Sequence, residues 1–156
     1  MRIIVIGPGA LGCFLAGKLS SKTEVWLLDH DPVRAARIID HGGIHCETKE
    51  GHWQAKIPVT ARAQDIGVVD AVILCTKAYH TREALLHAEP AIGKHTLVLS
   101  LQNGIGNSDF ISDMVGPART AVGVTHHGII KITEGRIRHA GEGPTYIGPL
   151  KGIAPA

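Results

Sequence analysis

The chain has 156 residues, of which 44% are hydrophobic, 4% aromatic and 19% charged, and its formal net charge is +2. A chain of this length can form one domain with a substantial core, but it is too short for two ordinary domains. The near balance of charge and the scarcity of aromatic side chains argue against nucleic acid or a membrane surface as the partner, so we expect a small molecule.

Two strand-and-helix pairs are predicted in the N-terminal part of the chain. A run of mostly β-branched apolar residues bounded by glycine predicts a strand at 2–6 that is buried on both faces. Apolar residues at helical spacing predict a helix at 10–20, and the sequence EVWLL predicts a second buried strand at 24–28. The Asp-Pro pair at 31–32 is typical of a capped helix start, and this helix is expected to end near residue 41.

The rest of the chain is also predicted to contain alternating strands and helices. Residues 44–60 alternate loosely and contain a glycine, so we expect a short antiparallel hairpin or irregular strands there. Short runs near the C-terminus, separated by turn residues, predict antiparallel strands at the sheet edge. The further predicted elements are strands at 70–76, 96–101 and 121–124, helices at 81–89 and 107–115, and edge strands at 129–132, 136–139 and 145–147.

This order of elements predicts the fold class. Strands that alternate with helices at short intervals favour βαβ units. We expect an α/β protein with a Rossmann-type, doubly wound, mostly parallel sheet and a small antiparallel addition near the C-terminus. One domain is expected over 1–149, and 150–156 is expected to begin a linker or tail because its prolines and glycines show no periodicity.

A GxGxxG motif lies between the first predicted strand and helix, which is the context in which the motif indicates dinucleotide binding. Gly7 permits a tight turn, Gly9 lets a pyrophosphate approach the backbone, and Gly12 lets the helix pack closely on the strand. The helix N-terminus adds free N–H groups and the positive end of its dipole. The alternative is a glycine-rich connection without a ligand. The candidate cofactor-binding residues here are Gly7, Pro8, Gly9, Ala10, Leu11 and Gly12.

The end of the second strand carries residues that point to two different cofactors. Asp29 lies about where an acidic residue hydrogen-bonds the adenosine ribose in NAD-binding domains of this kind. His30 and Arg34 follow it, and a cation there could receive the 2′-phosphate of NADP. Asp29 could also be only a turn residue or a helix cap. We expect NADP, with NAD left open because of Asp29.

Further segments, together with GPGALG, resemble the N-terminal domain of the ketopantoate reductase (2-dehydropantoate 2-reductase) family. The resemblance extends from residue 1 to about residue 149, and its specificity comes from the combination, since the TKA or QNG segment alone would be weak. The segments are LCTKAY at 74–79, LQNGIGN at 101–107, HAGEG at 139–143 and YIG at 146–148.

The resemblance implies hydride transfer from NADPH to the ketone of 2-dehydropantoate, a small 2-keto acid, in the biosynthesis of pantothenate and coenzyme A. It also implies that Lys77 and Asn103 line the cleft, where they help to place the nicotinamide and the substrate. Both residues follow the carboxyl ends of predicted parallel strands, where ligands bind in open α/β sheets. Without the resemblance, Lys77 could be a surface lysine and Asn103 part of an ordinary Asn-Gly turn.

Two features depart from the family pattern. The basic residue that often follows the second strand to hold the 2′-phosphate is not obvious, because Asp29 and His30 stand in that region. The family's general acid and a substrate-binding glutamate belong to a helical second domain that lies outside this sequence. Reduction needs a proton as well as a hydride, so we assign no catalytic residue here and expect the chain to bind nucleotide without reducing a ketone efficiently.

The histidines and the fold class leave room for other classes of function. Adjacent strand residues His126 and His127 point to opposite faces, and glycines interrupt the HxxxH spacing of His41 and His45, so no metal site is predicted. His80 and His139 could lie at the edge of the cleft. The first domain of another hydroxyacid or sugar-nucleotide dehydrogenase and a stand-alone nucleotide-binding module are the alternatives.

The cysteines and the hydropathy pattern bear on the location of the protein. The three cysteines are far apart and form no CxxC pair, which is typical of reduced thiols. The sequence has no apolar run of membrane-spanning length and no signal-peptide pattern. We therefore expect a cytoplasmic protein without nucleic-acid or membrane partners, and leave open a homo-oligomer or a C-terminal domain beyond these residues.

Overall fold

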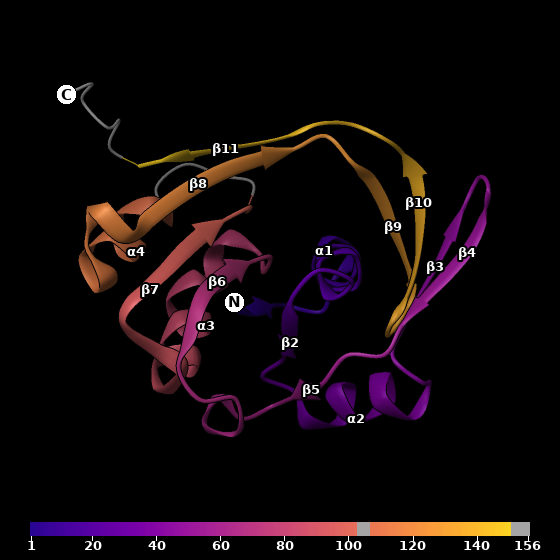
Figure 1. The fold of residues 1–156 in the computed structure, drawn as a ribbon, viewed down its shortest axis with the longest axis horizontal. Helices are drawn as coiled ribbons and strands as arrows, with labels where there is room; N and C mark the ends of the chain where they lie inside the picture. The colour runs from indigo at the N-terminus through magenta and orange to yellow at the C-terminus, as the bar shows by residue number, and fades with distance from the viewer. Residues whose placement is uncertain (103–106, 151–156) are drawn as a thin grey trace.

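The computed structural model describes residues 1–102 and 107–150 of the chain (Figure 1). The largest sheet in this part consists of β1 (Arg2–Ile6), β2 (Glu24–Leu28), β5 (Val59–Thr60), β6 (Val69–Leu74), β7 (Ile92–Ser100), β8 (Thr120–Thr125) and β11 (Thr145–Pro149). The strand order is β11-β8-β7-β6-β1-β2-β5. Pairing is parallel from β5 to β8, and β11 is antiparallel to β8.

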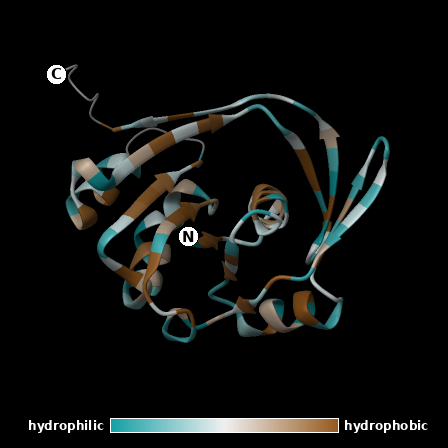
Figure 2. Cartoon of the chain, in the orientation of Figure 1, coloured by the Kyte–Doolittle hydropathy of each residue, from teal (hydrophilic) through white to brown (hydrophobic). Residues whose placement is uncertain are grey.

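Helices cover both faces of this sheet. They are α1 (Ala10–Ser20), α2 (Pro32–Asp40), α3 (Thr81–Ala88) and α4 (Asn107–Val115). Alternate side chains of β1 point to opposite faces, so Ile3 and Val5 share a core with Phe14 of α1, whereas Ile4 shares a second core with Leu85 of α3. Figure 2 shows hydrophobic residues concentrated on the strands of the main sheet and on α1. The predicted doubly wound, mostly parallel α/β fold is confirmed.

A second sheet is built from segments far apart in the sequence. Its strands β3 (Ile44–Thr48), β4 (Gly51–Ala55), β9 (Gly128–Thr133) and β10 (Arg136–Gly141) have the order β4-β3-β10-β9. β10 is parallel to β3 and antiparallel to β9. Ile44, Cys46 and Ile137 join the core that contains Phe14, and α1 lies between the two sheets (Figure 1).

The C-terminal strands differ in part from the prediction. β11 confirms the antiparallel addition at the edge of the main sheet, and β3 with β4 confirms the hairpin within 44–60. The expectation that 129–132 and 136–139 lie at the same edge is wrong, because β10 pairs with β3 in the second sheet. A period of two in the sequence shows which residues share a face, but it does not show which distant strand is the neighbour.

The helix boundaries follow from local chemistry. The Asp31 side chain accepts hydrogen bonds from the backbone N–H groups of Val33 and Arg34 at 2.9 and 3.2 Å, which confirms the predicted cap of α2. α2 ends before Gly42, whose φ is 81°. α3 ends at Ala88, before Pro90, as predicted.

Some predictions fall outside the described residues, namely those for Asn103 and for 151–156. Among the residues that the structure describes, no helix is long and apolar enough to cross a membrane.

Candidate functional site

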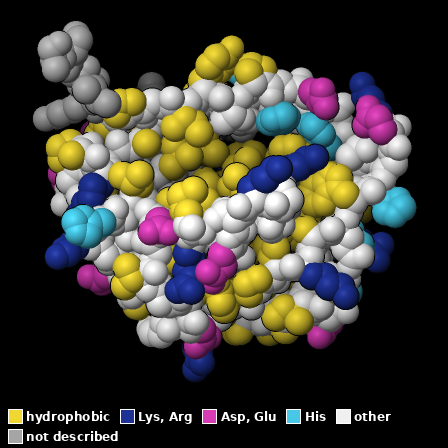
Figure 3. Space-filling model, viewed as in Figure 1, with side chains coloured by type: hydrophobic (Ala, Val, Ile, Leu, Met, Phe, Trp, Pro, Cys, Tyr) yellow, Lys and Arg dark blue, Asp and Glu magenta, His cyan; other side chains and the backbone are white. Residues whose placement is uncertain are grey.

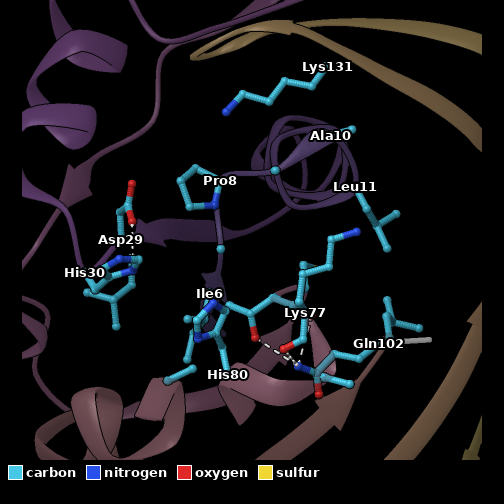
Figure 4. Close-up of a pocket in the computed structure, with 18 of the residues that line it drawn as sticks. Ile6, Pro8, Ala10, Leu11, Asp29, His30, Lys77, His80, Gln102 and Lys131 are labelled. Carbon is cyan, nitrogen blue, oxygen red and sulfur yellow. Dashed lines mark hydrogen bonds and ion pairs between the residues drawn. The ribbon is translucent and has the colours of Figure 1, made fainter. Parts of the chain in front are cut away.

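A cleft of about 730 Å³ lies at the carboxyl ends of the central parallel strands. Its walls come from the turn between β1 and α1, the end of β2 with the start of α2, the segments after β6 and β7, one side of α3, and one face of the segment from β8 into β9. Figure 4 shows Asp29 and His30 at one end, Lys77 and Gln102 at the other, and Pro8 between them. In the space-filling view, hydrophobic side chains line a hollow that has Lys or Arg and His side chains along its edge (Figure 3). Open α/β sheets bind ligands at this position.

The glycine-rich turn leaves open space on the cleft side and very little on the protein side. Gly7 has a φ of 97°, and a Cβ there would lie 2.8 Å from Cγ2 of Thr76. A Cβ on Gly12 would overlap with the carbonyl oxygen of Gly7, so the backbone of α1 approaches the turn closely at this residue. A Cβ on Gly9 would meet no protein atom within 4 Å. Gly9 lines the cleft, so its missing side chain leaves room for a ligand.

The N-terminus of α1 faces this space. Gly9 is the N-cap residue and provides no side-chain hydrogen bond to the helix. The first N–H groups of an α-helix have no intrahelical acceptor, and the helix dipole places positive potential there. The arrangement suits an anion such as a phosphate group.

At the β2 end of the cleft, Asp29 is not free to act as an exposed acceptor. Its carboxylate is held by the Arg34 guanidinium through two hydrogen bonds, from Nε and Nη2, and it also accepts the N–H of Asp31 at 3.2 Å. The Asp29 side chain is 1% exposed, whereas that of Arg34 is 28% exposed. The hydrogen bond to Asp29 raises the pKa of Arg34, so the guanidinium stays charged. Arg34 therefore neutralises the carboxylate and itself lines the cleft.

At the other end, the side chain of Gln102 ties the segment after β6 to the end of β7. Its Nε2 donates to the carbonyl oxygens of Thr76 and Lys77 at 3.0 and 3.3 Å. Its Oε1 accepts from the hydroxyl groups of Thr81 and Ser100 at 2.9 and 3.1 Å. Lys77 itself is exposed, and Figure 4 shows its side chain extending toward Leu11. Gln102 therefore positions the backbone that carries Lys77.

Gln102→Glu is expected to lower the free energy of unfolding by about 2 kcal/mol at pH 7, because a carboxylate would replace the amide donor opposite two carbonyl oxygens. This environment favours the protonated acid and raises its pKa, so the loss should shrink as the pH falls toward 5. Urea unfolding at pH 5 and pH 7 measures the effect. Gln64→Glu, at an exposed position outside the cleft, is the control. Equal stability of the two variants at pH 7 would contradict the positioning role.

A histidine pair supports the wall of the cleft opposite the turn. His127 lines the cleft, and its Nδ1 lies 3.1 Å from Nε2 of His139. Both rings pack on Phe14 of α1, with centroids 5.0 and 4.6 Å from the Phe14 ring. His80 also lines the cleft. Within residues 1–102 and 107–150, no group of three or more His, Cys, Asp or Glu side chains is placed to hold a metal ion.

Two thiols lie close to the glycine turn. Burial raises the pKa of Cys13 to about 12, and burial likewise raises the pKa of Cys75 to about 12. Both therefore stay protonated near neutral pH and lack the thiolate needed for nucleophilic chemistry. All three cysteines are free.

The cleft brings together most of the residues that the sequence singled out. Gly12 lies beneath it, in contact with Gly7, and Asn103 falls outside the described residues. Gln102, His127 and Lys131 also line the cleft, although no sequence motif predicts it; the period of two across 125–131 is the signal that indicates a shared face. The predicted residues that line the cleft are Gly7, Pro8, Gly9, Ala10, Leu11, Asp29, His30, Arg34, Lys77 and His80.

A doubly wound sheet with a glycine-rich turn at its first βα connection and a cleft at that turn defines a Rossmann-like dinucleotide-binding fold. The family model described as "Ketopantoate reductase PanE/ApbA" matches residues 3–152. The chain belongs to the ketopantoate reductase family, as its sequence motifs predict.

Individual relatives agree with this assignment. The chain is 34% identical over 157 aligned residues to a 2-dehydropantoate 2-reductase of Halobacterium salinarum, covering 97% of this chain and 50% of that protein. It is similar in structure to a PanE/ApbA family ketopantoate reductase from Ralstonia eutropha, with a TM-score of 0.84, 31% identity, and coverage of 94% and 49% of the two chains. A D-mandelate dehydrogenase solved with NADH and anilino(oxo)acetate matches with a TM-score of 0.86, 29% identity, and coverage of 97% and 49%. The chain thus spans about half the length of these proteins.

Proposed function

We propose that residues 1–149 form the NADP(H)-binding domain of a 2-dehydropantoate 2-reductase. The observation that carries the proposal is the space above Gly9, where no protein atom would meet a Cβ within 4 Å at the N-terminus of α1. A pyrophosphate in this space would accept hydrogen bonds from the first N–H groups of the helix. The family and the relatives named for 2-dehydropantoate support the substrate class.

The residues of the chain would then have separate tasks in the reaction. A nicotinamide bound in the cleft would supply a hydride for the ketone carbon of the keto acid. Lys77, exposed at the cleft, and Asn103 would hold the nicotinamide end and the keto acid near each other. The ketone oxygen also needs a proton, and we propose that its donor lies outside these 156 residues. This chain by itself should bind cofactor without rapid turnover.

Cofactor preference would depend on Asp29 and Arg34. An NAD-binding site uses a free carboxylate to accept the ribose hydroxyl groups, but both oxygens of Asp29 are already hydrogen-bonded. Arg34 is a partly exposed guanidinium at the edge of the cleft, with His30 beside Asp29, and a guanidinium binds phosphate well. We therefore propose NADPH as the preferred cofactor, with Arg34 as the ligand of the 2′-phosphate.

Asp29→Asn is expected to shift the ratio of NADPH to NADH affinity about tenfold toward NADPH. The substitution removes a negative charge beside the proposed phosphate site and releases Arg34 from its ion pair. Calorimetric titration of each variant with both cofactors measures the ratio. Asp40→Asn, at the exposed end of α2 and outside the cleft, controls for overall charge. An unchanged ratio in Asp29→Asn would contradict the role of the Asp29–Arg34 pair in cofactor preference.

A second candidate is the reduction of a different 2-keto acid with NADH, as in a D-mandelate dehydrogenase. The structural match to the NADH complex of that enzyme favours it. Because this chain is expected to bind cofactor without rapid turnover, titrations with NADPH and with NADH test the two candidates. Tighter binding of NADPH supports the first proposal. Tighter binding of NADH would overturn it in favour of the second. We also propose a cytoplasmic location, which the free thiols support.

A further inference from the structure

The wall of the cleft opposite the glycine turn is one face of the extended segment that runs from β8 into β9. β8 leads into β9, and every second residue from Thr125 to Lys131 lines the cleft, with His127 and Ile129 between them. This is the period expected of one face of an extended chain. β8 pairs with β7, whereas β9 pairs with β10 of the second sheet. Figure 1 shows the two strands passing over α1, so this wall runs from the β7 side of the cleft toward the β2 side.

Lys131 is the cation that this wall contributes to the cleft. Its side chain is exposed, and among the described residues no carboxylate lies within 4.0 Å of its ammonium group. Figure 4 shows it extending from β9 toward the side of the cleft that holds Pro8. The described residues therefore give this lysine no direct ion pair, although the pKa of the Glu134 carboxyl group is lowered by a backbone hydrogen bond and then by the charge of Lys131.

The charge of Lys131 also acts on the N-terminal part of α1. Burial raises the pKa of the Cys13 thiol, and the positive charge of Lys131 opposes that rise. Cys13 lies one turn into α1, and its N–H donates to the Gly9 carbonyl oxygen at 3.0 Å. Lys131 also lines the same cleft as Gly9 and Ala10 at the N-terminus of α1.

We propose that Lys131 binds the pyrophosphate of the dinucleotide from the side opposite the glycine turn. The inference rests on the proposed dinucleotide-binding function. Helix N–H groups contact a phosphate on one side only, and a flexible ammonium group on the facing wall supplies a charge-assisted hydrogen bond on the other. Arg34 is already placed at the β2 end for a 2′-phosphate. The second sheet would then take part directly in cofactor binding, in addition to covering α1.

The test compares Lys131→Gln with the unchanged chain by calorimetric titration with ADP, 2′-AMP, NADH and NADPH. ADP carries the pyrophosphate without a 2′-phosphate, and 2′-AMP carries the reverse. Lys131→Gln is expected to weaken ADP, NADH and NADPH about tenfold each and to leave 2′-AMP unchanged. Lys131→Arg, which keeps the charge, should stay within about threefold of the unchanged chain. Lys94→Gln, at an exposed position outside the cleft, should bind all four ligands normally.

The other outcomes are distinguishable. Equal binding of all ligands by Lys131→Gln would show that Lys131 is a solvated surface residue and would overturn this inference alone. A loss confined to NADPH and 2′-AMP would place Lys131 at the 2′-phosphate and would also overturn it. If the unchanged chain binds neither dinucleotide nor ADP, the proposed function fails first, and the role of Lys131 fails with it.

Discussion

Gly9→Ala is expected to weaken NADPH binding at least about a hundredfold while the melting temperature stays within about 3 °C of the unchanged chain. The new methyl group would meet no protein atom within 4 Å, and the backbone at Gly9, with φ of −75° and ψ of −170°, is accessible to alanine. The folded chain therefore tolerates the change. In the cleft, the methyl group would occupy the path of the pyrophosphate to the helix N–H groups, and two charge-assisted hydrogen bonds are worth about 3 kcal/mol or more.

Calorimetric titration and thermal unfolding by circular dichroism test this result together. Gly148→Ala is the matched control, because a Cβ at Gly148 also meets nothing within 4 Å and this residue lies on β11, away from the cleft. Gly148→Ala should keep both its affinity and its melting temperature. If Gly9→Ala binds NADPH as the unchanged chain does, the space above Gly9 does not hold the pyrophosphate.

Gly12→Ala is expected to have the opposite effect and to lower the free energy of unfolding by about 3 kcal/mol or more. Its Cβ would overlap with the carbonyl oxygen of Gly7, and it would also lie 3.4 Å from Cβ of Cys75. Backbone atoms cannot move aside as a flexible side chain can, so α1 would have to separate from β1 and lose contacts in the core beneath it. For a chain of this size, the melting temperature should fall by roughly 6–12 °C.

Thermal unfolding of Gly12→Ala measures this fall beside that of Gly9→Ala, which carries the same methyl group three positions earlier in the turn. A melting temperature of Gly12→Ala equal to that of the unchanged chain would contradict the close packing of helix on strand. The two variants together separate the structural glycine from the one proposed to bind ligand.

Much of the main sheet could be predicted because its signals are local. The strand at 2–6 and the helices at 10–20 and 107–115 were expected at the boundaries that the structure shows. Burial on both faces makes central strands uniformly apolar, and Pro32 and Gly42 mark the two ends of α2. The glycine-rich turn was also visible in the sequence, because its position after a strand gives the motif its meaning.

The second sheet could not be predicted in the same way. β3 and β10 are paired in parallel, with His45 opposite Arg136, and nothing in either segment identifies the other as its partner. Because β9 pairs with β10, that pairing also places β9 along the wall of the cleft opposite the glycine turn. Lys131 therefore emerges as a candidate ligand only once the arrangement of the strands is known.

Asp29 shows that the position of a residue in a motif does not by itself predict what its side chain binds. Its position predicts a ribose acceptor, but Arg34, on the first turn of α2, occupies its carboxylate. Both residues were recognised in the sequence as competing signals. Their spacing did not reveal that they bind each other, because the turn between β2 and α2 sets the distance between the two side chains.

Calorimetric titration of this chain with NADPH and with NADH tests the central claim most directly. We predict saturable binding of NADPH with one site per chain, weaker binding of NADH, and loss of both in Gly9→Ala. Failure of the folded chain to bind either cofactor would contradict the assignment of the cleft as a dinucleotide site.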